Sequence, residues 1–92
     1  MPYTKLKEGY CVNTSEAVKN RIIELCTARR WSFHALAGYS DIPSSTMTHI
    51  IDGTSKNPGI VTIKKICDGL GITLVEFFTT PVFENLEIET KE

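Results

Sequence analysis

The chain has 92 residues, of which 41% are hydrophobic and 23% charged, and its formal net charge is −1. This length supports one domain with one core and leaves too little chain for a separate catalytic domain with its own cleft. No apolar run approaches the roughly 18 residues of a membrane-spanning helix, and the first residues lack the apolar stretch of a signal peptide. We therefore expect a cytoplasmic protein with no membrane partner.

The acidic residues are concentrated at the end of the chain. Residues 81–92 contain four glutamates and one lysine, a net charge of −3, whereas residues 1–80 contain nine Lys or Arg and seven Asp or Glu, a net charge of +2. Such an acidic tail is consistent with solubility, with a site for a protein partner, or with a brake on non-specific binding to polyanions.

The three cysteines, Cys11, Cys26 and Cys67, are odd in number and lack C-x-x-C spacing. This pattern argues against a disulfide scaffold and against a zinc site. Cys26 and Cys67 have apolar neighbours in the sequence, so we predict that both are buried core thiols.

Residues 1–12 show no period and are predicted to form an N-terminal arm. A first helix is expected from Asn13 or Thr14 to Arg29 or Arg30, and a second over about 32–39, capped by Ser32. A third helix is predicted over about 43–52, with Pro43 at its first positions, and a fourth over about 60–70. In a fifth helix, Thr73 and Glu76 have the spacing of a capping box. Five short helices without a strand pattern predict an all-α, compact five-helix bundle over residues 13–80, with the acidic tail at 81–92.

The second and third helices are joined so closely that they must cross steeply, which predicts a helix-turn-helix. On the third helix the apolar residues are spaced to face the core, and the opposite side gathers short or polar side chains. The core-facing residues are Met47, Ile50 and Ile51, and the other side holds Ser44, Ser45, Thr48, His49 and Asp52. Ser and Thr are poor choices for an exposed helix face if only stability matters. Their hydroxyls suit hydrogen bonds to base edges or phosphates of DNA.

Several short motifs occur in an order and spacing that resemble a known family. They are Leu36-Ala37, Ser45-Thr46-Met47, the run from Ile50 to Gly53, Pro58, and the segment ICDGLGITLVEFF. Over about residues 16–78 the chain resembles the helix-turn-helix module of the Cro and repressor type, the XRE family of bacterial and phage transcription regulators. The resemblance implies a lambda-repressor-like bundle of five helices that binds DNA.

The resemblance also implies which residues meet DNA. The base-reading positions of the family fall on Ser44, Ser45 and His49, and Thr48 lies beside them. The phosphate-holding loop falls on Thr54, Ser55, Lys56 and Asn57. At the start of the second helix the family often has a phosphate-binding glutamine; here Phe33 stands in its place, so only backbone N–H groups behind the Ser32 cap are available for a phosphate.

Three other positions depart from the family pattern. Cys26 and Ile51 replace an Arg and an acidic residue that often pair, which we interpret as an apolar repacking of the same contact. Pro43 replaces a common Ser or Thr cap.

An enzyme, a metal site and a cofactor are not expected. Ser45 and His49 share an exposed helix face without an implied pocket, orienting carboxylate or oxyanion site, and no Gly-rich phosphate loop is present.

The sequence therefore predicts a sequence-specific DNA-binding transcriptional regulator, a repressor, that reads double-stranded DNA as a homodimer. The dimer contact is expected at the fifth helix, through Phe77 or Phe78, together with the tail from Val82 to Ile88. The alternative is a protein-interaction module of the same fold, antitoxin-like or an adaptor, whose C-terminal tail binds another protein.

Overall fold

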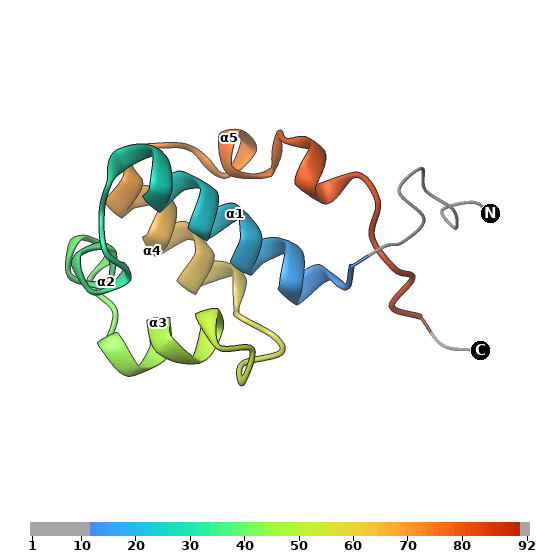
Figure 1. Ribbon diagram of the computed structural model, residues 1–92, viewed down its shortest axis with the longest axis horizontal. Coiled ribbons are helices and arrows are strands. Elements are labelled where there is room, and N and C mark those ends of the chain that lie inside the picture. Colours follow the sequence, from blue (N-terminus) through green and yellow to red (C-terminus); the bar gives the residue numbers. More distant parts are fainter. Residues whose placement is uncertain (1–11, 91–92) are drawn as a thin grey trace.

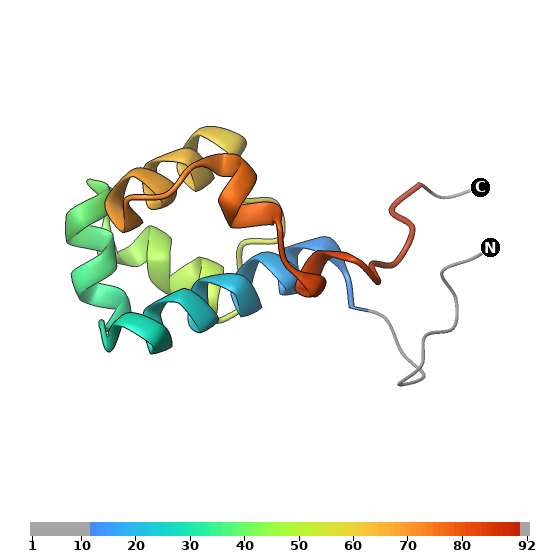
Figure 2. The same ribbon diagram turned by 90° about the horizontal axis from the view of Figure 1, so that it is seen from above.

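The computed structural model describes residues 12–90, which form five α-helices and a short 3-10 helix (Figure 1). The elements are α1 (Thr14–Arg29), α2 (Phe33–Ser40), α3 (Ser44–Ile51), α4 (Ile60–Leu70), α5 (Leu74–Phe78) and η1 (Pro81–Phe83). Figure 2 shows α1 and α4 on opposite sides of the bundle, with α2 across one end between them. The predicted all-α five-helix bundle is confirmed. The predicted arm lies outside the described residues except for Val12, as do Cys11 and the last two residues of the tail.

Side-chain caps begin three of the helices. Asn13 Oδ1 accepts from the Glu16 N–H at 2.8 Å, and Ser32 Oγ accepts from the Ala35 N–H at 3.0 Å. Thr73 and Glu76 form the predicted capping box, with bonds of 3.0 and 2.8 Å. Each bond satisfies an N–H that has no partner within its own helix, which fixes the first turn.

The hydrophobic core is formed by residues from one face of every α-helix. Its members are Val18, Ile22, Leu25, Cys26, Leu36, Ala37, Met47, Ile50, Ile63, Ile66, Cys67, Leu70 and Phe77. Both predicted core thiols are buried, and burial raises the pKa of Cys26 and of Cys67 above the usual value. Ile51 is half-buried and packs against this core, as expected for its apolar replacement of an acidic residue.

Two arginines of α1 hold the ends of other helices. The Arg21 guanidinium donates to the backbone oxygens of Phe77 and Glu76, each at 2.7 Å, at the end of α5. Arg29 donates to the Leu70 oxygen at 3.1 Å, at the end of α4. A cation is favourable at a helix C-terminus because the terminal carbonyls carry partial negative charge.

Helices α2 and α4 approach each other closely at Gly69. A Cβ atom at this position would overlap Ser40 Oγ and lie 3.0 Å from both Ser40 N and Tyr39 C. The Ser40 hydroxyl is buried without a hydrogen-bond partner among the described residues. The absence of a side chain at Gly69 therefore sets how near α2 lies to α4.

The chain after α5 folds back onto α1. The 3-10 helix packs against α1, and Phe83 packs on the core beside Phe77, with ring centroids 6.0 Å apart. Leu86 then forms a parallel bridge with Val12. Phe77 is completely buried, so of the two alternatives for the dimer contact, Phe77 or Phe78, only Phe78 has an exposed ring. None of the helices in residues 12–90 combines the length and apolarity needed to cross a membrane.

Candidate nucleic-acid interface

The turn between α2 and α3 is short and fixed by backbone bonds. Asp41 ends α2 in the left-handed region with φ 58°, and the Ile42 N–H donates to the Ala37 oxygen at 3.1 Å. Pro43 has extended backbone and occupies the N-cap of α3, one residue before the helix rather than inside it as predicted. Its carbonyl accepts from the Met47 N–H, and its fixed φ suits this entry. The two helices thus form the predicted helix-turn-helix.

Helix α3 has one buried and one exposed face. Met47 and Ile50 are 1% and 3% exposed and anchor the helix in the core. The four side chains predicted to read bases are all exposed: Ser44, Ser45, Thr48 and His49. The structure therefore brings these four residues together on the outer side of one helix.

No side chain caps the N-terminus of α3. The first N–H groups of a helix have no intrahelical partner, and they carry partial positive charge that suits a phosphate oxygen. At the start of α2, by contrast, the Ser32 hydroxyl already accepts from Ala35, and the Phe33 ring packs against the core. Ser32 and Phe33 can therefore bind a phosphate only through their backbone N–H groups or through the O–H of Ser32, which is still able to donate.

A histidine missed at the sequence level joins the starts of the two helices. His34 is exposed on the first turn of α2, and its Nδ1 lies 2.9 Å from Ser44 Oγ on the first turn of α3. The residues are ten apart in sequence, so helical periodicity gives no sign of the contact. The contact could have been predicted from the helix-turn-helix, because this motif places the starts of both helices near each other.

The loop after α3 is ordered by Asp52 and His49. Asp52 Oδ1 accepts from the Thr54 N–H at 2.8 Å, and the His49 carbonyl accepts from the Ser55 N–H at 2.9 Å. The hydrogen bond with the Thr54 side chain, then the one from its backbone, lower the pKa of Asp52. The His49 ring lies 4.0 Å from the Asp52 carboxylate. This arrangement fixes the loop that contains the predicted phosphate contacts.

The predicted phosphate contacts, Thr54, Ser55, Lys56 and Asn57, lie together in this loop, and only Ser55 is half-buried. Lys56 makes no ion pair within residues 12–90. It is the only Lys or Arg between residues 44 and 58. Lys56 is therefore the one Lys or Arg side chain of residues 44–58 that could bind a phosphate through its positive charge.

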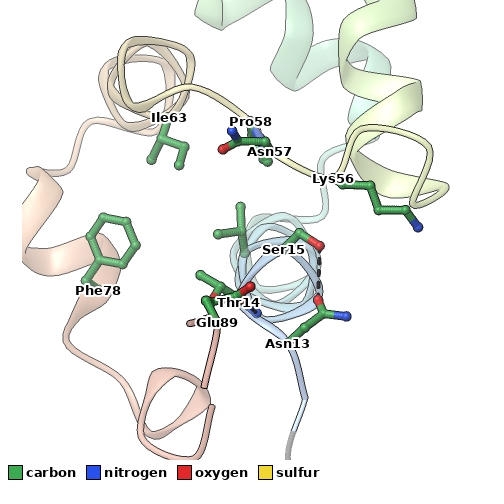
Figure 3. A pocket seen from close by; sticks show the side chains of 10 residues that line it. Asn13, Thr14, Ser15, Lys56, Asn57, Pro58, Ile63, Phe78 and Glu89 are labelled. Carbon is green, nitrogen blue, oxygen red and sulfur yellow. Dashed lines mark hydrogen bonds between the residues drawn. The ribbon is translucent and has the colours of Figure 1, made fainter. Parts of the chain in front are cut away.

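A pocket of about 600 Å³ lies behind the loop (Figure 3). Its lining combines apolar residues of the bundle with polar groups at the start of α1 and on the tail. These residues are Asn13, Thr14, Ser15, Val18, Lys56, Asn57, Pro58, Ile63, Phe78 and Glu89. In Figure 3 the Lys56 ammonium points away from the other labelled side chains, so the charge is directed outward.

The described part of the chain contains no group of three or more His, Cys, Asp or Glu side chains placed to hold a metal ion. His49 and Asp52 approach each other on an exposed helix face, with side chains that are 55% and 48% exposed. This exposure leaves the pair surrounded by solvent, where charge interactions are weak.

Residues 21–81 match the family of Cro/C1-type HTH DNA-binding domains. The crystal structure of the prophage Lp1 protein 11 is similar to this chain, with 31% sequence identity and a TM-score of 0.71. The match covers 84% of this chain and 99% of that chain. No curated protein matches.

Proposed function

Since the chain belongs to the family of Cro/C1-type helix-turn-helix DNA-binding domains, we propose that it is a sequence-specific transcriptional regulator, a repressor acting in the cytoplasm. In this proposal α3 enters the major groove of double-stranded DNA. The observation that carries it is the outer face of α3, where four side chains able to hydrogen-bond are exposed beside two buried anchors. A helix of this kind presents its first residues to base edges.

The proposed base contacts are Ser44, Ser45, Thr48 and His49. Their short side chains allow the helix to approach the groove closely, and hydroxyl and imidazole groups can donate or accept at base edges. The Thr48 methyl group also suits contact with a thymine methyl.

The proposed phosphate contacts lie on both sides of these base contacts. Backbone N–H groups at Ser32 and Phe33 would hold one phosphate, and the loop residues Thr54, Ser55, Lys56 and Asn57 another. Contacts to phosphate position the protein without reading sequence. The bond from Thr54 to Asp52 supports this role, because it holds the loop in place before DNA arrives.

We propose that the protein acts as a homodimer, since a single module of this size makes a modest interface with DNA. Two half-sites would lie about one helical turn, or ~34 Å, apart. Exposed apolar residues of α5 and the tail support a contact there: Val75 is 74%, Ile88 64% and Phe78 36% exposed.

A selection from random duplex DNA at ~0.15 M salt tests the proposal, because non-specific binding is typically far weaker than specific binding at this salt concentration. The expected result is an enriched palindromic motif. A matched selection with Ser45→Ala, which removes one hydroxyl from the outer face of α3, should lose preference at one position of each half-site. Absence of enrichment with the parent protein contradicts the proposal.

The same exposed apolar residues also favour a second candidate, a protein-interaction module that is antitoxin-like or an adaptor. In this case Val75, Ile88 and the acidic tail would bind another protein, and the selection would give no motif. The excess charge of only +2 in residues 1–80 is consistent with weak DNA binding.

A further inference from the structure

The hydrogen bond between His34 and Ser44 links the first turns of the two helices of the helix-turn-helix. The Nδ1 to Oγ distance is 2.9 Å, and both residues are exposed. The bond to His34 fixes the direction of the Ser44 hydroxyl, because His34 is its one hydrogen-bond partner among the described residues. A free hydroxyl rotates to suit whichever group is near, whereas this one has a partner before any base is present.

The direction of the bond depends on where the imidazole holds its hydrogen. If Nδ1 is unprotonated, the Ser44 O–H donates to it, and only oxygen lone pairs remain to face a base. If Nδ1 carries a hydrogen, it donates to Ser44 Oγ, and the Ser44 O–H is free to donate. Neutral imidazole has one donor and one acceptor nitrogen, while imidazolium has two donors.

We propose that His34 is a positioning residue that sets whether Ser44 faces a base as an acceptor or as a donor. This inference rests on the proposed function, and it adds to it a residue outside the predicted set of contacts. With neutral His34, hydrogen on Nε2, Ser44 accepts from the amino group of adenine or cytosine. When a proton from solvent binds Nδ1, Ser44 donates instead, and guanine or thymine, whose major-groove edges present only acceptors, becomes the better partner.

Nine charged or titratable groups lie on the elements packed against this pair. None of them forms a hydrogen bond or an ion pair with His34 within residues 12–90. The charged or titratable groups on α2, α3, α4 and the turns that flank α2 are Arg30, Tyr39, Asp41, His49, Asp52, Lys64, Cys67, Asp68 and Lys65. His49 lies near Asp52, and Lys64 pairs with Asp68, so Ser44 is the one described partner through which protonation of His34 acts directly.

The pair is tested first in the protein without DNA. Nitrogen chemical shifts of the His34 ring, measured by NMR above pH 8, should report hydrogen on Nε2 and an unprotonated, hydrogen-bonded Nδ1. In Ser44→Ala the Nδ1 signal should move toward that of a free imidazole. Hydrogen on Nδ1 at this pH, or no change on substitution, overturns the inference.

The second test is selection of duplex DNA at pH 8 and again at pH 5.5, where the solvent supplies far more protons. The Ser44→Ala variant identifies the base pair that Ser44 reads. At this position the parent should shift toward guanine or thymine at pH 5.5 by about fivefold, which corresponds to the ~1 kcal/mol of one typical hydrogen bond. His34→Gln offers an amide that does not titrate, so its preference should be the same at both pH values.

His49→Gln is the matched control, because it removes the other histidine of this surface and keeps His34. It should retain the pH-dependent shift at the Ser44 base pair. A parent motif without this shift, or the same shift in His34→Gln, overturns the inference and leaves the proposed function in place. No motif at either pH overturns the proposed function, and this inference with it.

Discussion

Replacement of Gly69 by alanine should push α2 away from α4. The added Cβ would overlap Ser40 Oγ and lie 3.0 Å from two backbone atoms, Ser40 N and Tyr39 C. A side-chain tip can rotate aside, but backbone atoms move only if the helix moves. Since α2 contains His34 and packs on α3, such a shift also disturbs the proposed DNA-binding surface.

The expected size of the effect follows from two opposing contributions. Overpacking costs ~1–3 kcal/mol, and the backbone contacts place Gly69→Ala toward the upper value. Alanine regains about 1 kcal/mol of helix propensity relative to glycine. The net loss is about 2 kcal/mol in the free energy of unfolding. For a domain of this size it corresponds to a decrease of roughly 8–16 °C in Tm.

Thermal and urea unfolding, followed by circular dichroism, measure this loss. Gly38→Ala is the matched control, because Gly38 is also helical and a Cβ there has no neighbour within 4 Å. It should gain ~0.5–1 kcal/mol. Adding Ser40→Ala to Gly69→Ala should restore part of the stability, since it removes the overlapping oxygen but leaves the backbone contacts. The reasoning is refuted if Gly69→Ala unfolds at or above the midpoint of the parent.

Three further predictions concern the DNA-binding surface. Lys56→Ala should weaken binding to all sequences alike and reduce the slope of log K against log salt by about 0.9, because one phosphate contact is lost; an unchanged slope in a binding titration removes Lys56 from the phosphate contacts. His49→Ala should change the preference at one or two operator positions by ~1–3 kcal/mol, measured with single-base operator variants, and unchanged preferences would show that His49 does not read bases. The pKa of Asp52 is lowered in the folded protein. Its bond to Thr54 therefore stabilises the loop at pH values above the ordinary carboxyl pKa of about 3.9, and this stabilisation is lost as the pH falls through the lower pKa of the folded state. The Thr54 amide proton should therefore shift with a midpoint below 3.9 in an NMR titration; a midpoint at or above 3.9 contradicts the assignment.

The helices were predictable because each leaves a local signal. The cap residues Asn13, Ser32 and Thr73 begin helices where the sequence indicated, and α4 has the predicted bounds. The end of α1 at Arg29 was also predicted. The positive φ angles that end α1 and α2, 61° at Arg30 and 58° at Asp41, were not predicted, because glycine adopts such angles more easily.

The contacts between distant segments were not predictable from periodicity. Phe83 reaches the core through its packing beside Phe77, which depends on the path of the chain after α5. The bond between His34 and Ser44 depends on the crossing of two helices. By contrast, the exposed face of α3 followed directly from its pattern of apolar and polar residues, because burial of Met47 and Ile50 fixes the rotation of the helix.

The bridge between Val12 and Leu86, strengthened by the bond from the Glu87 N–H to the Val12 oxygen at 2.9 Å, brings the two ends of the described chain together. Val12 lies two residues before the start of α1, whereas Figures 1 and 2 show α2 at the opposite end of α1. The 16 residues of α1 span about 24 Å. Chain ends that lie together permit circular permutation and fusion. A reporter or a second domain joined to the chain at Val12 or Leu86 would be separated from the end of the bundle that holds α2 by the length of α1.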